Sequence, residues 1–277
     1  MTNEVTVLQF DQQSPATAAV KLSVIAPTYN ETQCIGALIS TLEQSLAGID
    51  YEIIISDDDS PDLTWAHAEQ LAKLTRRLRV LRRMSNRGLG PAVVEAFAIA
   101  RGQAVACIDA DLQHDPNILP EMLKALERGS ELVVGSRYVA GGGTANWSWA
   151  RRFTSSTATT ITKCLLGIKI RDPMSGYFML RRTDFMRVRP LLKISGFKIL
   201  LEIAAQLQPG RITEVPYTFR PRAAGDSKLS SKVMFAFLLQ LLRLVSARRF
   251  TRTRIPAEAH PAPLGDAATE PKVPSAT

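Results

Sequence analysis

The chain of 277 residues is long enough to bury a sizeable core, and its hydrophobic content of 45% and charged content of 22% are typical of a globular protein. Its formal net charge of +8 favours an anionic partner, a property shared by nucleic acids, anionic membranes and phosphate-bearing substrates. Three widely spaced cysteines and three scattered histidines argue against a zinc site and against a Ser-His-Asp triad.

Nothing in the sequence predicts a leader peptide or a membrane span. No basic segment followed by an apolar one opens the chain, and no run of about 18 apolar residues follows. Cys34, Cys107 and Cys164 lack the spacing of metal ligands, so we expect free thiols in a reducing compartment. These features predict a cytoplasmic protein.

Short apolar runs alternate with helical patterns over the first half of the chain. Strands are expected at residues 22–26, 53–55, 78–81, 104–108 and 132–134. Helices are expected at about residues 35–46, 91–101, 117–128 and 153–166. A further helix is expected to follow the second strand, with Asp62 as its N-cap. The first strand is expected to end at Pro27, which restricts the backbone, and the second at the polar residue Asp57.

This alternation predicts an α/β protein with a mostly parallel sheet flanked by helices. Right-handed crossovers bring the carboxyl ends of parallel strands to one edge of the sheet, where open α/β sheets bind their ligands. That edge is expected to collect one tyrosine and five acids: Tyr29, Glu31, Asp57, Asp58, Asp109 and Asp111. The first strand-to-helix turn lacks a GxGxxG pattern, which argues against NAD.

The most informative segment is residues 105–116, where an apolar run ends in three acids. Asp109 and Asp111 are two residues apart, so in an extended segment their side chains lie on one side. Two close carboxylates repel unless a cation or a proton lies between them, and oxygen ligands suit Mg²⁺ or Mn²⁺. The alternative is a solvated, Asp-rich turn before a helix that starts near Pro116.

Three further segments contain polar residues beside expected elements. Residues 56–62 (SDDDSPD) are predicted to form a turn whose acids either bind the hydroxyls of a ribose or are simply solvated. Residues 171–182 (RDPMSGYFMLRR) predict a turn that runs into a strand, with Gly176 there for backbone freedom. Residues 219–230 (FRPRAAGDSKLS) are either a phosphate-binding loop, through Arg222 and Lys228, or a basic surface loop.

An apolar stretch at residues 233–245 is too short to cross a bilayer. Basic residues surround it, so it is predicted either to lie in the headgroup region of an anionic membrane or to pack on the sheet. From residue 251 onward the chain is rich in Pro and Ala, which predicts a disordered tail over 251–277. Residues 1–20 predict a flexible lead-in.

The order of these motifs resembles that of the polyprenol-phosphate mannose synthases. The matching segments, in order, are PTYNE, SDDDSPD, DADLQHDP, GSRYVAGGG, NWSWARR, RDPMSGYFML, GFKILLEI and VPYTFRPRAAGDSKLS. That family belongs to the inverting, metal-dependent glycosyltransferases of family 2, which have the A-type fold. The resemblance implies a catalytic domain over residues 21–250, with an interfacial helix at about 229–249.

The resemblance also assigns roles to particular residues. The positions that hold the nucleoside are matched by Pro27, Tyr29, Glu31, Ser56 and Asp58. The metal ligands are matched by Asp109, Asp111 and Gln113, with Ala110 as a substrate contact between the two acids. The positions facing phosphates are matched by Arg137, Arg151, Arg222 and Lys228. Asp111, Arg222 and Lys228 are the implied catalytic residues.

Two positions depart from the family pattern. Leu63 stands where members often have Gly, and Ser156 stands where many have a basic residue. Some members also carry C-terminal membrane-spanning helices, and no segment of this sequence predicts one.

The implied function is mannose transfer from GDP-mannose to a polyprenyl phosphate such as dolichyl phosphate. It requires Mg²⁺ or Mn²⁺, takes place at the cytoplasmic face of a membrane, and is compatible with a small membrane subunit. The alternatives are transfer of another sugar such as glucose, and a non-catalytic protein that binds a nucleotide sugar or a lipid. No known nucleic-acid-binding module is recognisable, so nucleic acid is not an expected partner.

Overall fold

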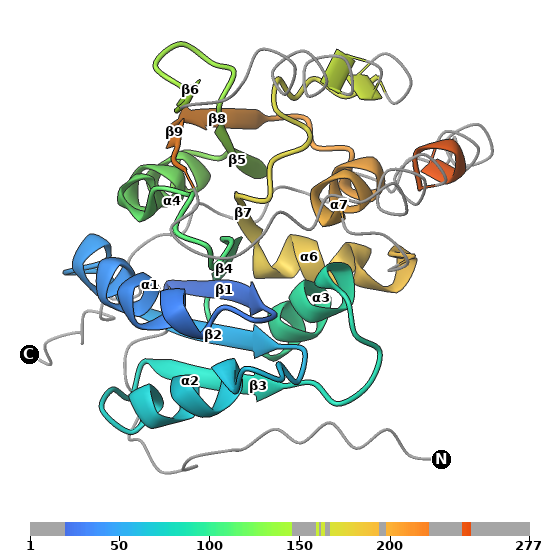
Figure 1. Ribbon diagram of the computed structural model, residues 1–277. Helices are drawn as coiled ribbons and strands as arrows, with labels where there is room; N and C mark the ends of the chain where they lie inside the picture. Colours follow the sequence, from blue (N-terminus) through green and yellow to red (C-terminus); the bar gives the residue numbers. More distant parts are fainter. Residues whose placement is uncertain are drawn as a thin grey trace, which may run out of the picture.

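A seven-stranded sheet with the order β3-β2-β1-β4-β7-β5-β8 forms the centre of the protein (Figure 1). The computed structural model describes residues 20–145, 159–160, 162–163, 167–193, 198–221 and 240–244. The strands of this sheet are β1 (Leu22–Thr28), β2 (Tyr51–Asp57), β3 (Leu78–Arg82), β4 (Ala104–Cys107), β5 (Leu132–Ser136), β7 (Phe178–Arg181) and β8 (Ile212–Pro216). A separate parallel pair is formed by β6 (Gly143–Thr144) and β9 (Thr218–Phe219).

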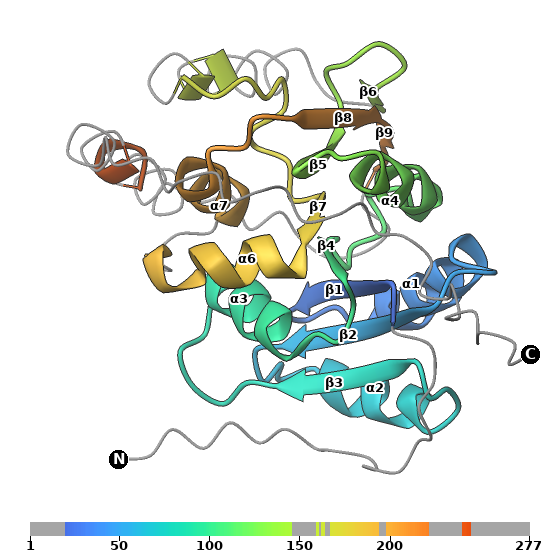
Figure 2. The same ribbon diagram turned by 180° about the vertical axis from the view of Figure 1, so that it is seen from behind.

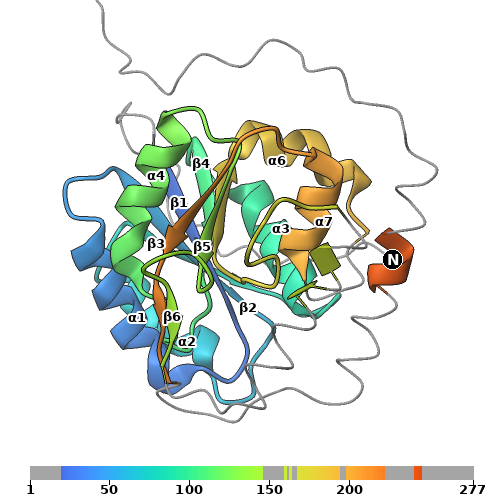
Figure 3. The ribbon, with the colours of Figure 1, turned by 90° about the horizontal axis from the view of Figure 1, so that it is seen from above.

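Helices cover both faces of the sheet, with α1, α2 and α4 on one face and α3, α6 and α7 on the other (Figure 3). Their bounds are α1 (Thr32–Ser45), α2 (Thr64–Ala72), α3 (Leu89–Ile99), α4 (Leu119–Glu127), α6 (Arg182–Val188) and α7 (Ile199–Leu207). Single 3₁₀ turns, η1 (Pro116–Ile118) and η2 (Arg189–Leu191), come before α4 and after α6. The predicted α/β fold, with a mostly parallel sheet flanked by helices, is therefore confirmed.

The sheet is parallel except at β7. β1 pairs in parallel with β2 and β4, and β5 pairs in parallel with β8, whereas β7 runs antiparallel between β4 and β5. Because β7 is reversed, it begins at the edge where its neighbours end. That edge, where β1, β2 and β4 end at Thr28, Asp57 and Cys107, is called the carboxyl edge below.

The core consists of two clusters, one on each face of the sheet. Neighbouring residues of β1 point to opposite faces, so Ile25 packs in the cluster of α3 and α7, and Val24 in that of α1 and α4. Both faces of each central strand are thus buried, which explains why the strands read as continuous apolar runs. Figure 2 shows α3, α6 and α7 covering the first of these faces.

The first two strands extend further than predicted. β1 includes Pro27 and Thr28, and β2 includes Asp57, although these polar or conformationally restricted residues were expected to end them. Thr28 pairs with Asp57 across the strands, and its hydroxyl donates to Asp57 Oδ2 at 2.8 Å. Because these two buried polar side chains are hydrogen-bonded to each other, the pairing of β1 with β2 continues to the carboxyl edge.

The prediction that Asp62 is the N-cap of the second helix was wrong by one residue. Leu63 is the N-cap of α2 and has a left-handed backbone with φ of 61°. Asp62 still stabilises this end, since its Oδ1 accepts from the backbone N–H of Thr64 at 3.1 Å. Its Oδ2 accepts from the N–H of Thr32 at 3.1 Å, which joins the amino ends of α1 and α2.

Residues 240–244 are the described part of the stretch predicted to lie in a membrane surface. Leu241 and Leu244 are buried in the cluster that contains α7, and Leu242 is exposed. Glu202 of α7 is buried and contacts both Gln240 and Arg243. In the described residues this segment therefore packs on α7, and none of the described helices is long and apolar enough to cross a membrane.

Candidate active site

Segments from both halves of the chain meet at the carboxyl edge. Ile25 of β1 lies beside Cys107 of β4, and Cys107 lies beside Phe178, the first residue of β7. Residues 108–113, which follow β4, therefore lie next to residues 172–177, which precede β7. The segment after β8 reaches the same place, because the backbone N–H of Arg220 donates to Gln113 O at 2.9 Å.

The residues matched to nucleoside binding lie along β1 and β2 at this edge. Pro27 is buried opposite Ser56, and Tyr29 just beyond β1 is 41% exposed. Glu31 is the N-cap of α1 and is partly buried. Ser56 is fully buried and its hydroxyl donates to Ala92 O at 2.9 Å, so its side chain faces the helix α3.

The three consecutive acids of the SDDDSPD segment, residues 57–59, have different surroundings. Asp57 is buried and accepts from Ser60 N at 2.8 Å and from Ser60 Oγ at 2.7 Å. Asp59 is paired with Arg82 and Arg87. Of the two alternatives for this segment, the solvated turn is thus wrong for Asp57, whose buried side chain bonds to the turn from inside.

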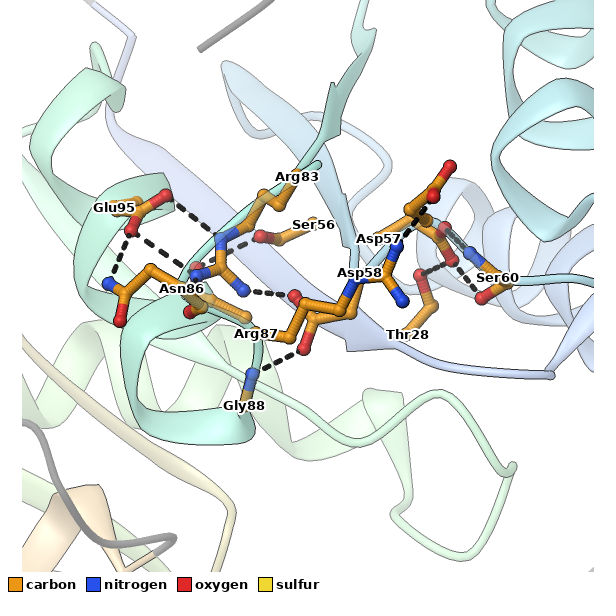
Figure 4. Close-up of polar contacts among 12 residues, drawn as sticks. Thr28, Ser56, Asp57, Asp58, Ser60, Arg83, Asn86, Arg87, Gly88 and Glu95 are labelled. Carbon is orange, nitrogen blue, oxygen red and sulfur yellow. Dashed lines mark hydrogen bonds and ion pairs between the residues drawn. The ribbon is translucent and has the colours of Figure 1, made fainter. Parts of the chain in front are cut away.

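Asp58 belongs to a buried ion-pair cluster between β2 and α3 (Figure 4). Its Oδ1 accepts from Arg83, and its Oδ2 accepts from the backbone N–H of Gly88 at 2.6 Å. Arg83 also donates from Nε to Glu95 Oε2 at 2.9 Å and from Nη2 to Asn86 O at 2.6 Å. Burial raises the pKa of the Asp58 carboxyl, while the contacts with Gly88 and Arg83 lower it. We call these five residues the Asp58 cluster.

Arg83 is a residue that the sequence analysis missed. It is one of six arginines between residues 76 and 87, a pattern that is typical of a solvated basic face. Its side chain is 1% exposed, whereas that of Arg87 is 48% exposed. No residue type in the segment distinguishes the two, because their burial depends on α3 packing over the end of β3.

The two acids after β4 lie on a turn, so the premise of an extended segment was wrong. β4 ends at Cys107, and Leu112 has a left-handed backbone with φ of 62°. Asp109 keeps a side chain that is 37% exposed, and Asp111 is 5% exposed. Ala110 between them is buried. Both acids lie at the carboxyl edge because the chain turns after β4, and not because alternate residues of a strand point to one side.

Gln113 fixes the end of this turn. Its backbone N–H donates to Asp111 Oδ1 at 3.1 Å, and its Nε2 donates to Arg220 O at 2.9 Å. With Nε2 used in this way, Oε1 is the side-chain atom able to coordinate a cation. We call residues 109–113 the acidic turn.

The donor set of the acidic turn fits a hard cation. It offers two carboxylates and one amide oxygen, and Mg²⁺ is commonly held by one or two carboxylates together with substrate phosphates. In the described part of the chain, no group of three or more His, Cys, Asp and Glu side chains is arranged to hold a metal ion. The turn therefore fits a cation shared with a bound diphosphate better than a closed protein cage.

His114 lies directly under the acidic turn. Its Nδ1 accepts from the backbone N–H of Asp109 at 3.1 Å, and its Nε2 lies 3.7 Å from Asp109 Oδ2. The ring stacks on Tyr177 with a centroid distance of 5.0 Å. Burial lowers the pKa of His114, and the charges of Asp109 and Asp111 oppose this shift.

The prediction that Gly176 provides backbone freedom was wrong. Its φ is not in the left-handed region, but a Cβ at this position would lie 3.0 Å from each carboxylate oxygen of Asp109. Glycine lets the backbone approach Asp109 closely, because any larger residue would require the carboxylate to shift. The predicted turn into a strand is confirmed, since β7 begins at Phe178.

Arg137, matched to a position facing phosphates, forms a buried bidentate pair with Asp172. Nε and Nη2 of Arg137 each lie 2.7 Å from a carboxylate oxygen of Asp172. This pairing raises the pKa of Arg137, so the guanidinium is a fixed positive charge in the wall of the site. Its orientation is set by Asp172 before any ligand binds.

Lys198 is a second residue that the sequence analysis missed. It lies in the GFKILLEI motif, just before α7, and its Nζ donates to Met174 O at 3.2 Å. Burial lowers the pKa of this amine, and the charges of Asp109 and Asp172 raise it while Arg137 lowers it. The signal available in the sequence was a lysine directly before an apolar helix. In the sequence analysis, this motif contributed only to the resemblance to the polyprenol-phosphate mannose synthases.

Arg151, Arg222 and Lys228 lie outside the described residues, as does Ser156. Arg220, which precedes Arg222 and Lys228 in the sequence, is described, and its carbonyl oxygen accepts from Gln113 Nε2.

Solved structures define the class of this fold. Glucosyl-3-phosphoglycerate synthase from Mycobacterium tuberculosis, in complex with Mn²⁺, UDP and glucosyl-3-phosphoglycerate, aligns with a TM-score of 0.61 at 20% identity, over 86% of each chain. Mannosyl-3-phosphoglycerate synthase from Rubrobacter xylanophilus aligns with a TM-score of 0.59 at 19% identity, over 87% of this chain and 79% of that one. The fold is that of the A-type glycosyltransferases.

Sequence comparison gives the family. The pattern of glycosyl transferase family 2 matches residues 23–189. Dolichol-phosphate mannosyltransferase from Pyrococcus furiosus is 40% identical over 230 residues, which are 82% of this chain and 64% of that protein. The Saccharomyces cerevisiae protein of the same name is 36% identical over 236 residues, 82% of this chain and 87% of that one. The chain belongs to glycosyl transferase family 2, and it spans just under two thirds of the Pyrococcus relative.

Proposed function

We propose that the protein transfers mannose from GDP-mannose to a polyprenyl phosphate such as dolichyl phosphate. The observation that carries this proposal is the acidic turn, which lies at the carboxyl edge between the Asp58 cluster and the segment leading to Arg222. The relatives named dolichol-phosphate mannosyltransferase support it, as does the polyprenol monophosphomannose synthase of Mycolicibacterium smegmatis, 36% identical over 79% of this chain and 85% of that one.

The proposed reaction needs no general base. A phosphate monoester has a second pKa of about 6, so the acceptor is already an anionic nucleophile at neutral pH. Attack of its oxygen on the sugar C1 forms the new C–O bond and breaks the bond to the diphosphate, which leaves as GDP. The residues therefore have to stabilise the leaving group and align the acceptor.

Each part of the carboxyl edge then has a task. We propose that Asp109, Asp111 and the Oε1 of Gln113 hold Mg²⁺ or Mn²⁺. When bound, the cation would act as a Lewis acid on the diphosphate of the donor. The side of the edge formed by Tyr29 and Asp58 would bind the nucleoside. Because Ser56 Oγ already donates to Ala92, a contact of Ser56 with the nucleoside would involve its backbone.

Fixed positive charges would keep the phosphates of donor and acceptor close together despite their repulsion. Arg137 provides one such charge in the described part of the site. Arg151, Arg222 and Lys228 are proposed to provide the others. Loss of a charge-assisted contact costs about 1.5–3 kcal/mol, which corresponds to roughly ten- to a hundredfold in rate.

A transfer assay tests this function. The protein is incubated with radiolabelled GDP-mannose, GDP-glucose or UDP-glucose and with a polyprenyl phosphate, and the lipid extract is counted. We expect labelled lipid from GDP-mannose, its loss in EDTA and its recovery with Mn²⁺ or Mg²⁺. Asp111→Asn is expected to lose most activity while it stays folded. Label only from UDP-glucose, or full activity in EDTA, would contradict the proposal.

We further propose that the protein works at the cytoplasmic face of a membrane, as a peripheral protein. The acceptor carries its phosphate at the bilayer surface, and the net charge of +8 favours an anionic headgroup layer. A small membrane subunit would be compatible with this arrangement.

A further inference from the structure

Asp109 is the more exposed carboxylate of the acidic turn, so its orientation needs an explanation. An exposed carboxylate rotates freely unless neighbouring groups restrict it, and a ligand that has to be ordered on binding loses affinity. Two groups touch Asp109 from different sides: the ring of His114 and the backbone of Gly176. Neither has a place in the proposed transfer chemistry.

The His114 ring contacts Asp109 twice. The backbone N–H of Asp109 can only donate, so the Nδ1 that lies 3.1 Å away has to be the unprotonated acceptor. The ring proton of the neutral imidazole is then on Nε2, which lies 3.7 Å from Asp109 Oδ2. One ring thus fixes the main chain of Asp109 and faces its carboxylate with a positive N–H dipole.

Aromatic side chains hold this ring in place. Tyr177 stacks on it at an interplanar angle of 19°, and Tyr217 and Phe219 meet it edge-on, with centroids at 5.4 Å and 5.6 Å. The hydroxyl of Tyr177 donates to Asp115 O at 3.1 Å, which anchors the residue after His114. The ring is therefore held in one orientation by Tyr177 just before β7, by Tyr217 between β8 and β9, and by Phe219 of β9.

Gly176 restricts the other side of the carboxylate. A Cβ at this position would lie 3.0 Å from Oδ1 and from Oδ2 of Asp109 and 3.3 Å from Cγ. The hydroxyl of Ser175, the preceding residue, donates to Gly135 O at 2.7 Å, so this backbone is tied to β5. The carboxylate therefore packs closely against this backbone, and a Cβ at position 176 would require it to shift.

We propose that His114 and Gly176 are positioning residues that hold the Asp109 carboxylate in the orientation needed to bind the divalent cation. The inference rests on the proposed function, because it takes the acidic turn as the cation site. It extends that site to a ring that follows the end of β4 and a glycine that precedes the start of β7, both at the carboxyl edge. Partners of this kind typically contribute ten- to a hundredfold in metal affinity.

Mn²⁺ binding in the presence of GDP, measured by the electron paramagnetic resonance signal of free Mn²⁺, tests the proposal without relying on turnover. We expect His114→Phe, which keeps an aromatic ring, and Gly176→Ala to raise the Kd for Mn²⁺ by about ten- to a hundredfold. His114→Asn retains an acceptor near Nδ1 and is expected to recover part of the affinity. If His114→Phe does not fold, Gly176→Ala carries the test alone.

Phe97→Leu is the matched control for lost stability. Phe97 packs edge-on against Phe178 and Phe185 in the cluster of α3, on the face of the sheet away from His114. It should lower the melting temperature and leave the Kd for Mn²⁺ unchanged. A weakening of Mn²⁺ binding by this control equal to that of Gly176→Ala would overturn the proposal.

Asp109→Asn separates the two levels of the argument. If it abolishes Mn²⁺ binding while the folded His114→Phe and Gly176→Ala variants bind within threefold of wild type, the positioning role is wrong and the cation site stands. If Asp109→Asn itself binds Mn²⁺ like the wild type, the acidic turn is not the cation site, and the proposed function and this inference fail together.

Discussion

Several residues of the carboxyl edge have a backbone conformation that side chains normally avoid. Asn30, Asp59, Leu63 and Leu112 have φ between 53° and 62°. Asn and Asp tolerate this region because their short polar side chains bond locally, but for leucine it costs about 1–2 kcal/mol. Leu112 is part of the acidic turn, so this backbone strain occurs where Asp109 and Asp111 are held close together. Leu63 is 56% exposed and closes the turn between β2 and α2.

Leu63→Gly is expected to stabilise the protein. Glycine adopts φ of 61° without steric cost, and little burial is lost with the exposed side chain. The greater freedom of glycine in the unfolded chain offsets part of the gain, which leaves about 0.5 kcal/mol. Urea unfolding measures it. Leu74→Gly is the control, because Leu74 is 83% exposed and is not among the residues with positive φ. It should destabilise, and equal losses from both variants would show that Leu63 is not strained.

At the scale of elements, the Asp58 cluster joins three parts of the chain. Arg83 follows β3, Asp58 follows β2, and Glu95 lies on α3. The backbone N–H of Gly88, the N-cap of α3, completes the contacts of Asp58. The cluster therefore fixes the position of the end of β2 relative to α3.

Arg83→Met should destabilise the protein by about 3–5 kcal/mol, because it leaves two acids in the cluster without their buried cation. Methionine keeps most of the side-chain volume of arginine, so the loss of stability reflects the missing positive charge. Arg87→Met is the matched control, since its side chain is 48% exposed and pairs with Asp59. An exposed pair contributes about 0–1 kcal/mol. Guanidinium unfolding compares the two, and equal losses would show that the cluster is not a buried ion pair.

At the scale of the whole molecule, the net charge and the C-terminal basic residues bear on membrane binding. Leu241 and Leu244 are used in the core, so the described part of this segment does not present a fully apolar face to a membrane. Electrostatic attraction then has to supply much of the proposed affinity. Seven basic residues flank or interrupt the stretch: Lys228, Lys232, Arg243, Arg248, Arg249, Arg252 and Arg254.

Flotation with anionic vesicles tests this attraction. The full chain should float with vesicles that contain phosphatidylserine and be released by high salt, because each basic residue near the surface contributes about 1 kcal/mol. The double variant Arg248→Gln/Arg249→Gln should bind more weakly. Arg76→Gln/Arg77→Gln removes the same charge from the exposed connection between α2 and β3 and should bind like the wild type. A wild-type chain that stays at the bottom of the gradient would contradict peripheral attachment.

The sequence by itself determined the fold class, the order of the elements as far as β5, and the segments of the candidate site at the ends of β2 and β4. These follow from local patterns: apolar runs buried on both faces, helical spacing between them, and polar residues after each strand. The motifs around Asp58 and Asp109 were identified in the same way. Two of the three cysteines, Cys34 and Cys107, are buried.

Only the tertiary structure decided what touches those residues. β7 enters the sheet antiparallel between β4 and β5, which brings Gly176 against Asp109 from a distant part of the sequence. The burial of Arg83 and the contact of His114 with Tyr177 likewise arise from elements that are far apart along the chain. Local pattern sets which residues form a strand or a helix. Long-range packing, with its requirement that buried charges and polar groups find partners, sets what each side chain meets.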